Sequence, residues 1–193
     1  MVNYPNKKKN TQFQSSVSST KKVSAKHRGM NLEEDLNITN QYYLVNDVAV
    51  IYKKPTPVQI VKVDYPKRSA ARIVEAYYRT PSTTDYNGLY KGKYIDFEAK
   101  ETRKTTFPFA NITTHQIEHL SNIIKHNGIA FIIIAFTTLN EVYLIDALYM
   151  INAYNSLQRK SLKYEEIKEN GHLIPQGFNP RLHYLKIVDE LYF

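Results

Sequence analysis

The sequence contains no cysteine, which excludes disulfide bonds and thiolate-bound zinc. Its longest apolar run, Ile129–Phe136, has eight residues, whereas a membrane-spanning helix needs about 20. A G-x-S-x-G nucleophile motif and nucleotide-binding glycine loops are also missing, and the first residues lack the apolar segment of a signal peptide. These absences favour a soluble protein with a cytoplasmic location and no membrane partner.

Acidic residues are few relative to basic ones. The 193 residues include 26 Lys and Arg against 18 Asp and Glu, a net charge of +8. This excess favours a polyanionic partner, most often nucleic acid. Residues 1–28 hold seven basic residues and no acid, so a flexible basic arm is expected there, followed by a single domain over residues 29–193.

Apolar periodicity predicts alternating helices and strands, typical of an α/β domain. The run Ile129–Phe136 is apolar throughout, which indicates a strand buried on both faces. Asn31 and Glu34 stand in capping-box positions and open the first helix. Helices are predicted over about residues 31–44, 114–126, 147–158 and 164–169, with a last one capped by Asn179 and opened by Pro180. Single strands are predicted over about residues 48–52, 58–63, 73–79, 129–136 and 141–145.

A basic segment lies at about residues 53–78. Three prolines surround its alternating strand 58–63, and proline blocks pairing in a central strand, so the segment is predicted to protrude as a stalk with Tyr65 near its tip. Two interpretations stay open: a probe into nucleic acid, or a surface hairpin whose lysines prevent edge aggregation. Its candidate DNA contacts, with one residue just beyond it, are Lys53, Lys54, Lys62, Lys67, Arg68, Arg72 and Arg79.

The stretch Thr83–Lys100 is predicted to be a β-hairpin turning at Lys91-Gly92. If Tyr90 faces Lys93, then Asp85 lies opposite Glu98, because opposed residue numbers sum to a constant. Strand alternation places six polar side chains on one face. They are Thr83, Asp85, Asn87, Asp96, Glu98 and Lys100.

Carboxylates opposed across a strand pair lie roughly 5 Å apart, and their repulsion is on the order of 3 kcal/mol at an effective dielectric near 20. A divalent cation between Asp85 and Glu98 would relieve it. Mg²⁺ prefers oxygen ligands and, in phosphodiester cleavage, activates water and neutralises developing charge. Lys100 would position the water or stabilise the transition state. The hairpin therefore predicts a nuclease site with Asp85, Glu98 and Lys100 as catalytic residues, and a solvated strand face is the alternative.

Three further residues are candidates for this site. Gln116, on a separate helix, could reach the carboxylates as a neutral metal ligand. Asp96 and Glu34 are second-tier candidates. The run His115-Gln-Ile-Glu118-His119 also fits the H-x-x-E-H zinc-peptidase pattern, but no distal ligand is evident and the basic charge suits it poorly.

Several motifs together resemble the RecU family of Holliday-junction resolvases, over roughly residues 28–193. They are Lys-Lys-Pro-Thr-Pro-Val-Gln-Ile-Val from Lys53, Tyr-Pro-Lys-Arg-Ser from Tyr65, Ser-Thr-Thr-Asp-Tyr-Asn-Gly from Ser82, Tyr-Ile-Asp-Phe-Glu-Ala-Lys-Glu from Tyr94, and the histidine pentapeptide from His115. The resemblance implies a restriction-endonuclease-like α/β core, a mixed central sheet flanked by helices, with a protruding basic stalk that enters the junction.

The resemblance also implies an activity: Mg²⁺-dependent, or Mn²⁺-dependent, cleavage of four-way DNA junctions by a homodimer that contacts the RecA recombinase. The implied metal site is formed by Thr83, Asp85, Glu98 and Gln116, with Lys100 assisting the transition state. A non-catalytic protein that binds structured DNA and regulates recombination is the alternative function.

Overall fold

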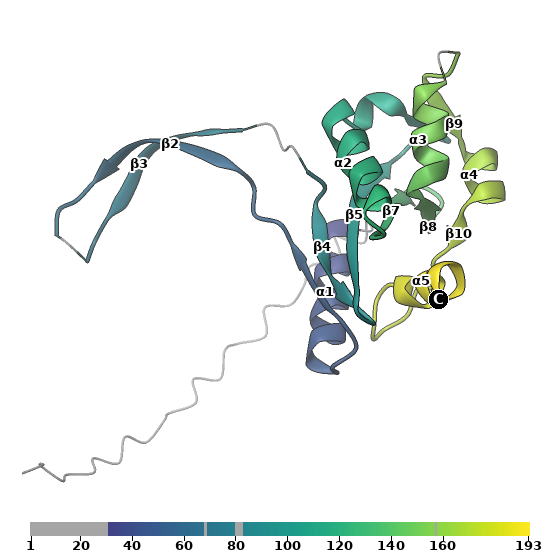
Figure 1. Cartoon of the computed structure of the whole chain (residues 1–193), viewed down its shortest axis with the longest axis horizontal. Helices are drawn as coiled ribbons and strands as arrows, with labels where there is room; N and C mark the ends of the chain where they lie inside the picture. Colours follow the sequence, from purple (N-terminus) through teal and green to yellow (C-terminus); the bar gives the residue numbers. More distant parts are fainter. Residues whose placement is uncertain (1–30, 68, 80–82, 157) are drawn as a thin grey trace, which may run out of the picture.

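A six-stranded mixed sheet forms the centre of the protein in the computed structural model, which describes residues 31–67, 69–79, 83–156 and 158–193 (Figure 1). Among these residues, the only parallel neighbours in the sheet are β5 and β7. The predicted arm over residues 1–28 lies outside the described residues, as does Arg68. In spatial order the strands are β1 (Val50–Lys53), β4 (Tyr86–Tyr90), β5 (Lys93–Thr102), β7 (Ile129–Phe136), β8 (Glu141–Asp146) and β10 (His172–Leu173).

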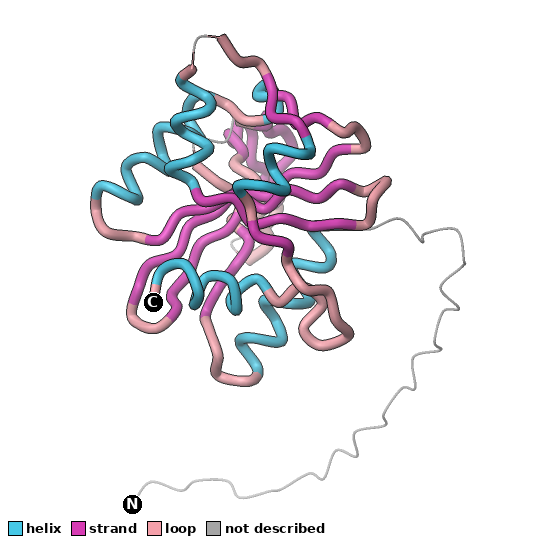
Figure 2. Tube along the Cα trace, turned by 90° about the vertical axis from the view of Figure 1, so that its right-hand side faces the viewer, coloured by secondary structure: helices cyan, strands magenta, loops and turns pink. Residues whose placement is uncertain are grey.

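Helices cover both faces of this sheet (Figure 2). On one face α1 (Leu32–Val45) and α5 (Tyr184–Tyr192) share a hydrophobic core with the strands. On the other face the core includes residues of α2 (Thr114–Lys125), α3 (Ala147–Asn155) and α4 (Tyr164–Asn170). Strand β7 lies between the two cores, and all its residues are buried, as its unbroken apolar run predicts.

The β4–β5 hairpin has the predicted register. Tyr90 pairs with Lys93, and the pairing continues without a bulge to Tyr86 opposite Phe97. The turn residues Lys91 and Gly92 have φ values of 47° and 76°, as a two-residue hairpin turn of type I′ requires. This tight turn therefore fixes which side chains of β5 share a face.

The basic stalk protrudes from the body as predicted (Figure 1). Strands β2 (Val58–Asp64) and β3 (Arg72–Tyr78) pair only with each other among the described strands, and all their residues are exposed except the partly buried Val63. The predicted fold class, a mixed central sheet flanked by helices with a protruding basic stalk, is confirmed.

The predicted start of the last helix is wrong. It begins at Tyr184, not at Pro180, because the preceding residues are held in an extended loop. Gln176 and Leu182 form a β-bridge, and the Leu182 amide donates a hydrogen bond of 3.0 Å to Thr39 Oγ1 on α1. The short strands β6 (Thr106–Pro108), β9 (Ser161–Lys163) and β10 and the 3₁₀ turn Phe109–Asn111 were not predicted, since two or three residues show no periodicity.

Membrane-spanning helices are not found in the described part of the chain, where no helix combines sufficient length with sufficient apolarity.

Gly88 provides a test of the close approach of β1 to β4. A Cβ at this position would lie 2.0 Å from the Val50 carbonyl oxygen, so Gly88→Ala would push two paired strands apart. We expect it to lower the free energy of unfolding by about 1–3 kcal/mol, measured by urea denaturation. Gly92→Asn is the comparison: a Cβ added there would meet no atom within 4 Å beyond its chain neighbours, so only the positive φ, which asparagine tolerates better than most residues, opposes it, and a smaller loss of about 1 kcal/mol or less is expected. Equal effects of the two substitutions would contradict this packing.

Candidate functional site

The Glu98 carboxylate is buried without a hydrogen-bonding partner. Its side chain, on β5, is 0% exposed, and neither oxygen accepts a hydrogen bond of good geometry from the described residues. The Nζ atom of Lys100 lies 2.6 Å from Glu98 Oε1 as an ion pair, and the Lys100 side chain is 26% exposed. Since a buried charged group without hydrogen bonds is costly, this carboxylate is poised to bind a proton or a cation.

The acidity of Glu98 reflects these surroundings. Its pKa is raised to about 8, chiefly by burial and also by the neighbouring Asp85 carboxyl, while Lys100 opposes both effects. Asp85 directly precedes β4, so the two acids lie close together at the place that the register predicts. A divalent cation would favour the ionised form of both, and the residues present therefore fit an oxygen-ligated metal.

Gln116, the predicted neutral ligand, is 4% exposed at the start of α2. Its Oε1 accepts a hydrogen bond of 2.9 Å from the Thr113 amide, and its own amide donates one of 3.3 Å to Thr113 Oγ1, which together form a capping box. Gln116 therefore also stabilises the N-terminus of α2. Thr83 is partly buried, and its hydroxyl lies 3.5 Å from the Thr84 carbonyl oxygen.

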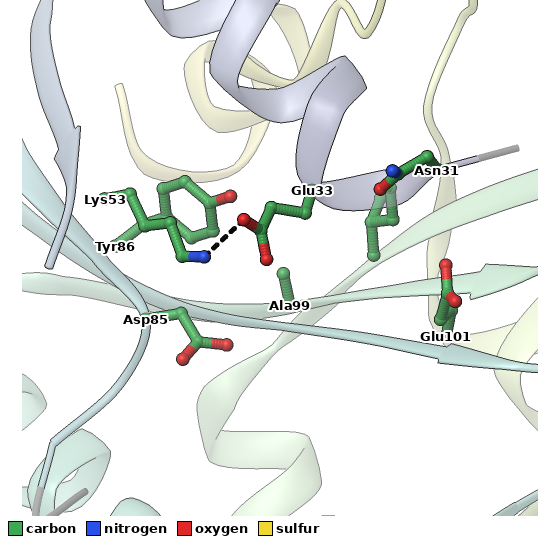
Figure 3. A pocket seen from close by; sticks show the side chains of 8 residues that line it. Asn31, Glu33, Lys53, Asp85, Tyr86, Ala99 and Glu101 are labelled. Carbon is green, nitrogen blue, oxygen red and sulfur yellow. Dashed lines mark ion pairs between the residues drawn. The ribbon is translucent and has the colours of Figure 1, made fainter. Parts of the chain in front are cut away.

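A pocket of about 280 Å³ adjoins Asp85 on the side of α1 (Figure 3). Glu33 and Lys53 form an ion pair of 2.5 Å across it. Glu34, the second-tier candidate, does not line this pocket; it is exposed, and its amide donates to Asn31 Oδ1. Glu33 carries no signal in the sequence that ranks it above Glu34 or Asp35, because the rotation of the helix decides which of three consecutive acids faces the pocket. The pocket is lined by Asn31, Leu32, Glu33, Lys53, Asp85, Tyr86, Ala99 and Glu101.

Asp96, the other second-tier candidate, is 0% exposed and fully hydrogen-bonded. Its Oδ2 lies 2.9 Å from Lys54 Nζ, 2.9 Å from the Tyr94 hydroxyl and 3.1 Å from His119 Nε2. Its Oδ1 accepts a hydrogen bond from the Thr84 hydroxyl. Its surroundings are thus the opposite of those of Glu98, two residues further along the same strand face.

The predicted DNA contacts fall into two groups. Lys62 and Lys67 are exposed, and within the described ranges neither forms an ion pair. Four more, leaving aside Arg68 outside the described residues, are engaged by the protein: Lys53 with Glu33, Lys54 with Asp96, Arg72 with Asp64 at 3.2 Å, and Arg79 with Gln59 at 3.2 Å. Lys62 and Lys67 are therefore the stalk cations most available to phosphates.

The zinc-peptidase pattern does not assemble into a site. His115 Nδ1 lies 3.7 Å from Glu118 on the exposed surface, whereas His119 turns inward to Asp96. Groups of three or more His, Cys, Asp or Glu able to hold a metal are not found among the described residues.

Comparison with known proteins identifies relatives along the whole chain. The family model of RecU, Recombination protein U, matches residues 27–190. Proteins named Holliday junction resolvase RecU from Bacillus thuringiensis (strain Al Hakam), Bacillus cereus (strain AH820) and Bacillus anthracis (strain CDC 684 / NRRL 3495) are each 55% identical over 197 residues, covering 100% of this chain and 98% of theirs.

A solved structure is also similar in outline. It is Hjc, a Holliday junction resolvase of Archaeoglobus fulgidus, with a TM-score of 0.46 and 9% identity over 74% of this chain and 93% of the other. The family match and the full-length identity confirm the resemblance inferred from the motifs: the chain belongs to the RecU family.

Proposed function

We propose that this protein is a metal-dependent endonuclease that cleaves four-way DNA junctions. The observation that carries the proposal is the buried Glu98 carboxylate, which accepts no hydrogen bond of good geometry from the described residues and lies beside Asp85 and Lys100. Membership in a family whose curated relatives are named Holliday junction resolvases supports the substrate. The basic net charge of +8 supports binding to DNA.

Asp85 and Glu98 would hold the metal through their carboxylates, and Thr83 and Gln116 would add neutral oxygens. Mg²⁺ fits this oxygen-only set, and Mn²⁺ can substitute for it. When bound, the metal supplies an activated water and neutralises negative charge on the phosphate. Lys100 keeps a positive charge beside Glu98, where it would stabilise the charge that develops on the phosphate oxygens.

The stalk would bind the junction centre. Its two strands have no core of their own, and a two-stranded hairpin alone is marginally stable, so it is suited to contact a partner. Tyr65 and Tyr78 are 68% and 85% exposed and could stack on unpaired bases. As the resemblance to the RecU family implies, we further propose that the protein acts as a homodimer and contacts the RecA recombinase.

The two carboxylates test the site. Asp85→Asn and Glu98→Gln should each lower the rate of junction cleavage in Mg²⁺ by about 1,000-fold or more, because a bound metal contributes several kcal/mol to the transition state. Junction affinity in EDTA should stay within about threefold, since neither acid contacts phosphate directly. A wild-type protein that binds junctions tightly without metal-dependent cleavage would instead favour the DNA-binding alternative.

Stability should report the metal site without any DNA. Since the folded pKa of Glu98 is about 8 against 4.5 for the ordinary group, the folded protein binds the proton more tightly, and its contribution to stability is lost as pH rises from about 4.5 through about 8. In EDTA, urea denaturation should show wild-type stability falling over this range relative to Glu98→Gln. Added Mg²⁺ should stabilise the wild type more at pH 8 than at pH 5.5, because proton and metal compete. Parallel pH profiles of the two proteins would exclude this site.

The stalk lysines should determine the salt dependence of binding. Lys62→Gln and Lys67→Gln should each reduce the slope of log affinity against log salt by about one, since each removes one phosphate contact. Fluorescence anisotropy with a labelled junction between 50 and 200 mM salt measures this slope. Lys160→Gln, an exposed lysine on the main body, is the matched control and should leave the slope unchanged. If all three variants behave alike, the stalk does not contact phosphate.

A further inference from the structure

Two buried carboxylates on one face of β5 have opposite surroundings. Glu98 accepts no hydrogen bond of good geometry, whereas both oxygens of Asp96 are occupied by donors. The donors belong to four segments: Lys54 at the root of the stalk, Thr84 before β4, Tyr94 on β5 and His119 on α2. A carboxylate saturated by protein donors has little capacity left for a metal.

The contacts of Asp96 reach the segment that carries Thr83 and Asp85. Thr84, between them, donates to Asp96, and Lys54 Nζ lies 3.0 Å from the Thr84 hydroxyl. The Lys54 amide also donates to the Asp85 carbonyl oxygen at 2.7 Å. Asp96 and Lys54 therefore hold the chain in place at Thr84, immediately before Asp85, and at the Asp85 carbonyl group itself.

The same carboxylate reaches the helix that carries Gln116. His119 follows Gln116 by three residues, so the two side chains lie on neighbouring positions of one helix face. The contact of His119 Nε2 with Asp96 at 3.1 Å holds the second turn of α2, one turn beyond Gln116, against β5. Glu98 lies two residues beyond Asp96 on the same strand face, and Asp96 thereby joins all the elements that bear the proposed ligands.

We propose that Asp96 is a positioning residue: it does not bind the metal but holds the Asp85 segment and α2 in register with Glu98. This inference rests on the proposed metal site. Outer-shell partners of this kind orient the ligands, and their loss weakens metal binding although every ligand is still present. Lys54, which the sequence suggested as a DNA contact, is one of the residues that hold Asp96 and the Asp85 segment together.

Calorimetric titration of the DNA-free protein with MnCl₂ tests the proposal. Asp96→Asn keeps the shape of the side chain but turns an amide donor toward existing donors, and should weaken Mn²⁺ binding about 10- to 100-fold. Thr84→Val removes one donor and should weaken it about fivefold. Arg159→Met is the control: it breaks an ion pair of 2.7 Å with Glu166, outside the hairpin, and should leave Mn²⁺ affinity unchanged.

The rate of junction cleavage at saturating Mn²⁺ distinguishes a residue that positions the metal ligands from a residue that binds the metal itself. Excess metal should restore the turnover of Asp96→Asn to within about tenfold of wild type, whereas Glu98→Gln should stay inactive. Unchanged Mn²⁺ affinity in both Asp96→Asn and Thr84→Val would overturn the proposal. Loss of turnover in Asp96→Asn that excess metal does not restore, with normal affinity in Thr84→Val, would show that Asp96 is itself a ligand.

Two further results must be told apart: an Asp96 variant that does not fold, and a protein that binds Mn²⁺ but does not cleave junctions. If Asp96→Asn fails to fold, as judged by its urea transition, Thr84→Val and Lys54→Met decide the result. For Lys54→Met, Mn²⁺ affinity should fall, and Lys54→Arg should recover part of it. If wild type binds Mn²⁺ in an Asp96-dependent way but does not cut junctions, the proposed substrate fails while the positioning role stands.

Discussion

The burial of Glu98 is the constraint on which the candidate site depends. A carboxylate buried in a six-stranded sheet, which accepts no hydrogen bond of good geometry from the described residues, stays ionised only if positive charge is brought to it. Lys100 supplies part of that charge from the same strand face, and Asp85 works against it. The core thus contains one carboxylate, Glu98, whose negative charge is only partly balanced by its surroundings. An incompletely balanced buried charge is typical of a functional site.

The neighbouring strands and helices each position a different part of the candidate site around Glu98. The tight Lys91–Gly92 turn sets the register that brings Asp85 to Glu98, and the parallel pairing with β7 keeps β5 in the middle of the sheet. Helix α2 begins with a capping box whose Gln116 has a structural role before any metal binds. Asp96 ties these parts together through side chains separated by up to 65 positions in the chain, from Lys54 to His119.

Local patterns in the sequence predicted the parts of this arrangement that depend on local geometry. The Lys91-Gly92 dipeptide predicted the hairpin register, the apolar run Ile129–Phe136 predicted β7, and the prolines around residues 58–63 predicted the stalk. Contacts between distant segments had no such signal. The hydrogen bond between Leu182 and Thr39 holds the preceding loop extended, so the last helix begins only at Tyr184. The rotation of α1 about its axis places Glu33, rather than Glu34, in the pocket beside Asp85. The role of Asp96 required tertiary partners that no spacing reveals.

The root of the stalk has a consequence for how the protein can change. The chain leaves the body after Lys54 and returns before Asp85, and a backbone hydrogen bond of 2.7 Å joins these two residues; a second of 3.0 Å joins Arg79 to Pro57 further out. The loop is therefore closed at its base by the body itself. A stalk of another length or sequence on this base would leave the candidate metal site in place, so the proposed DNA-contacting element and that site would be free to change independently.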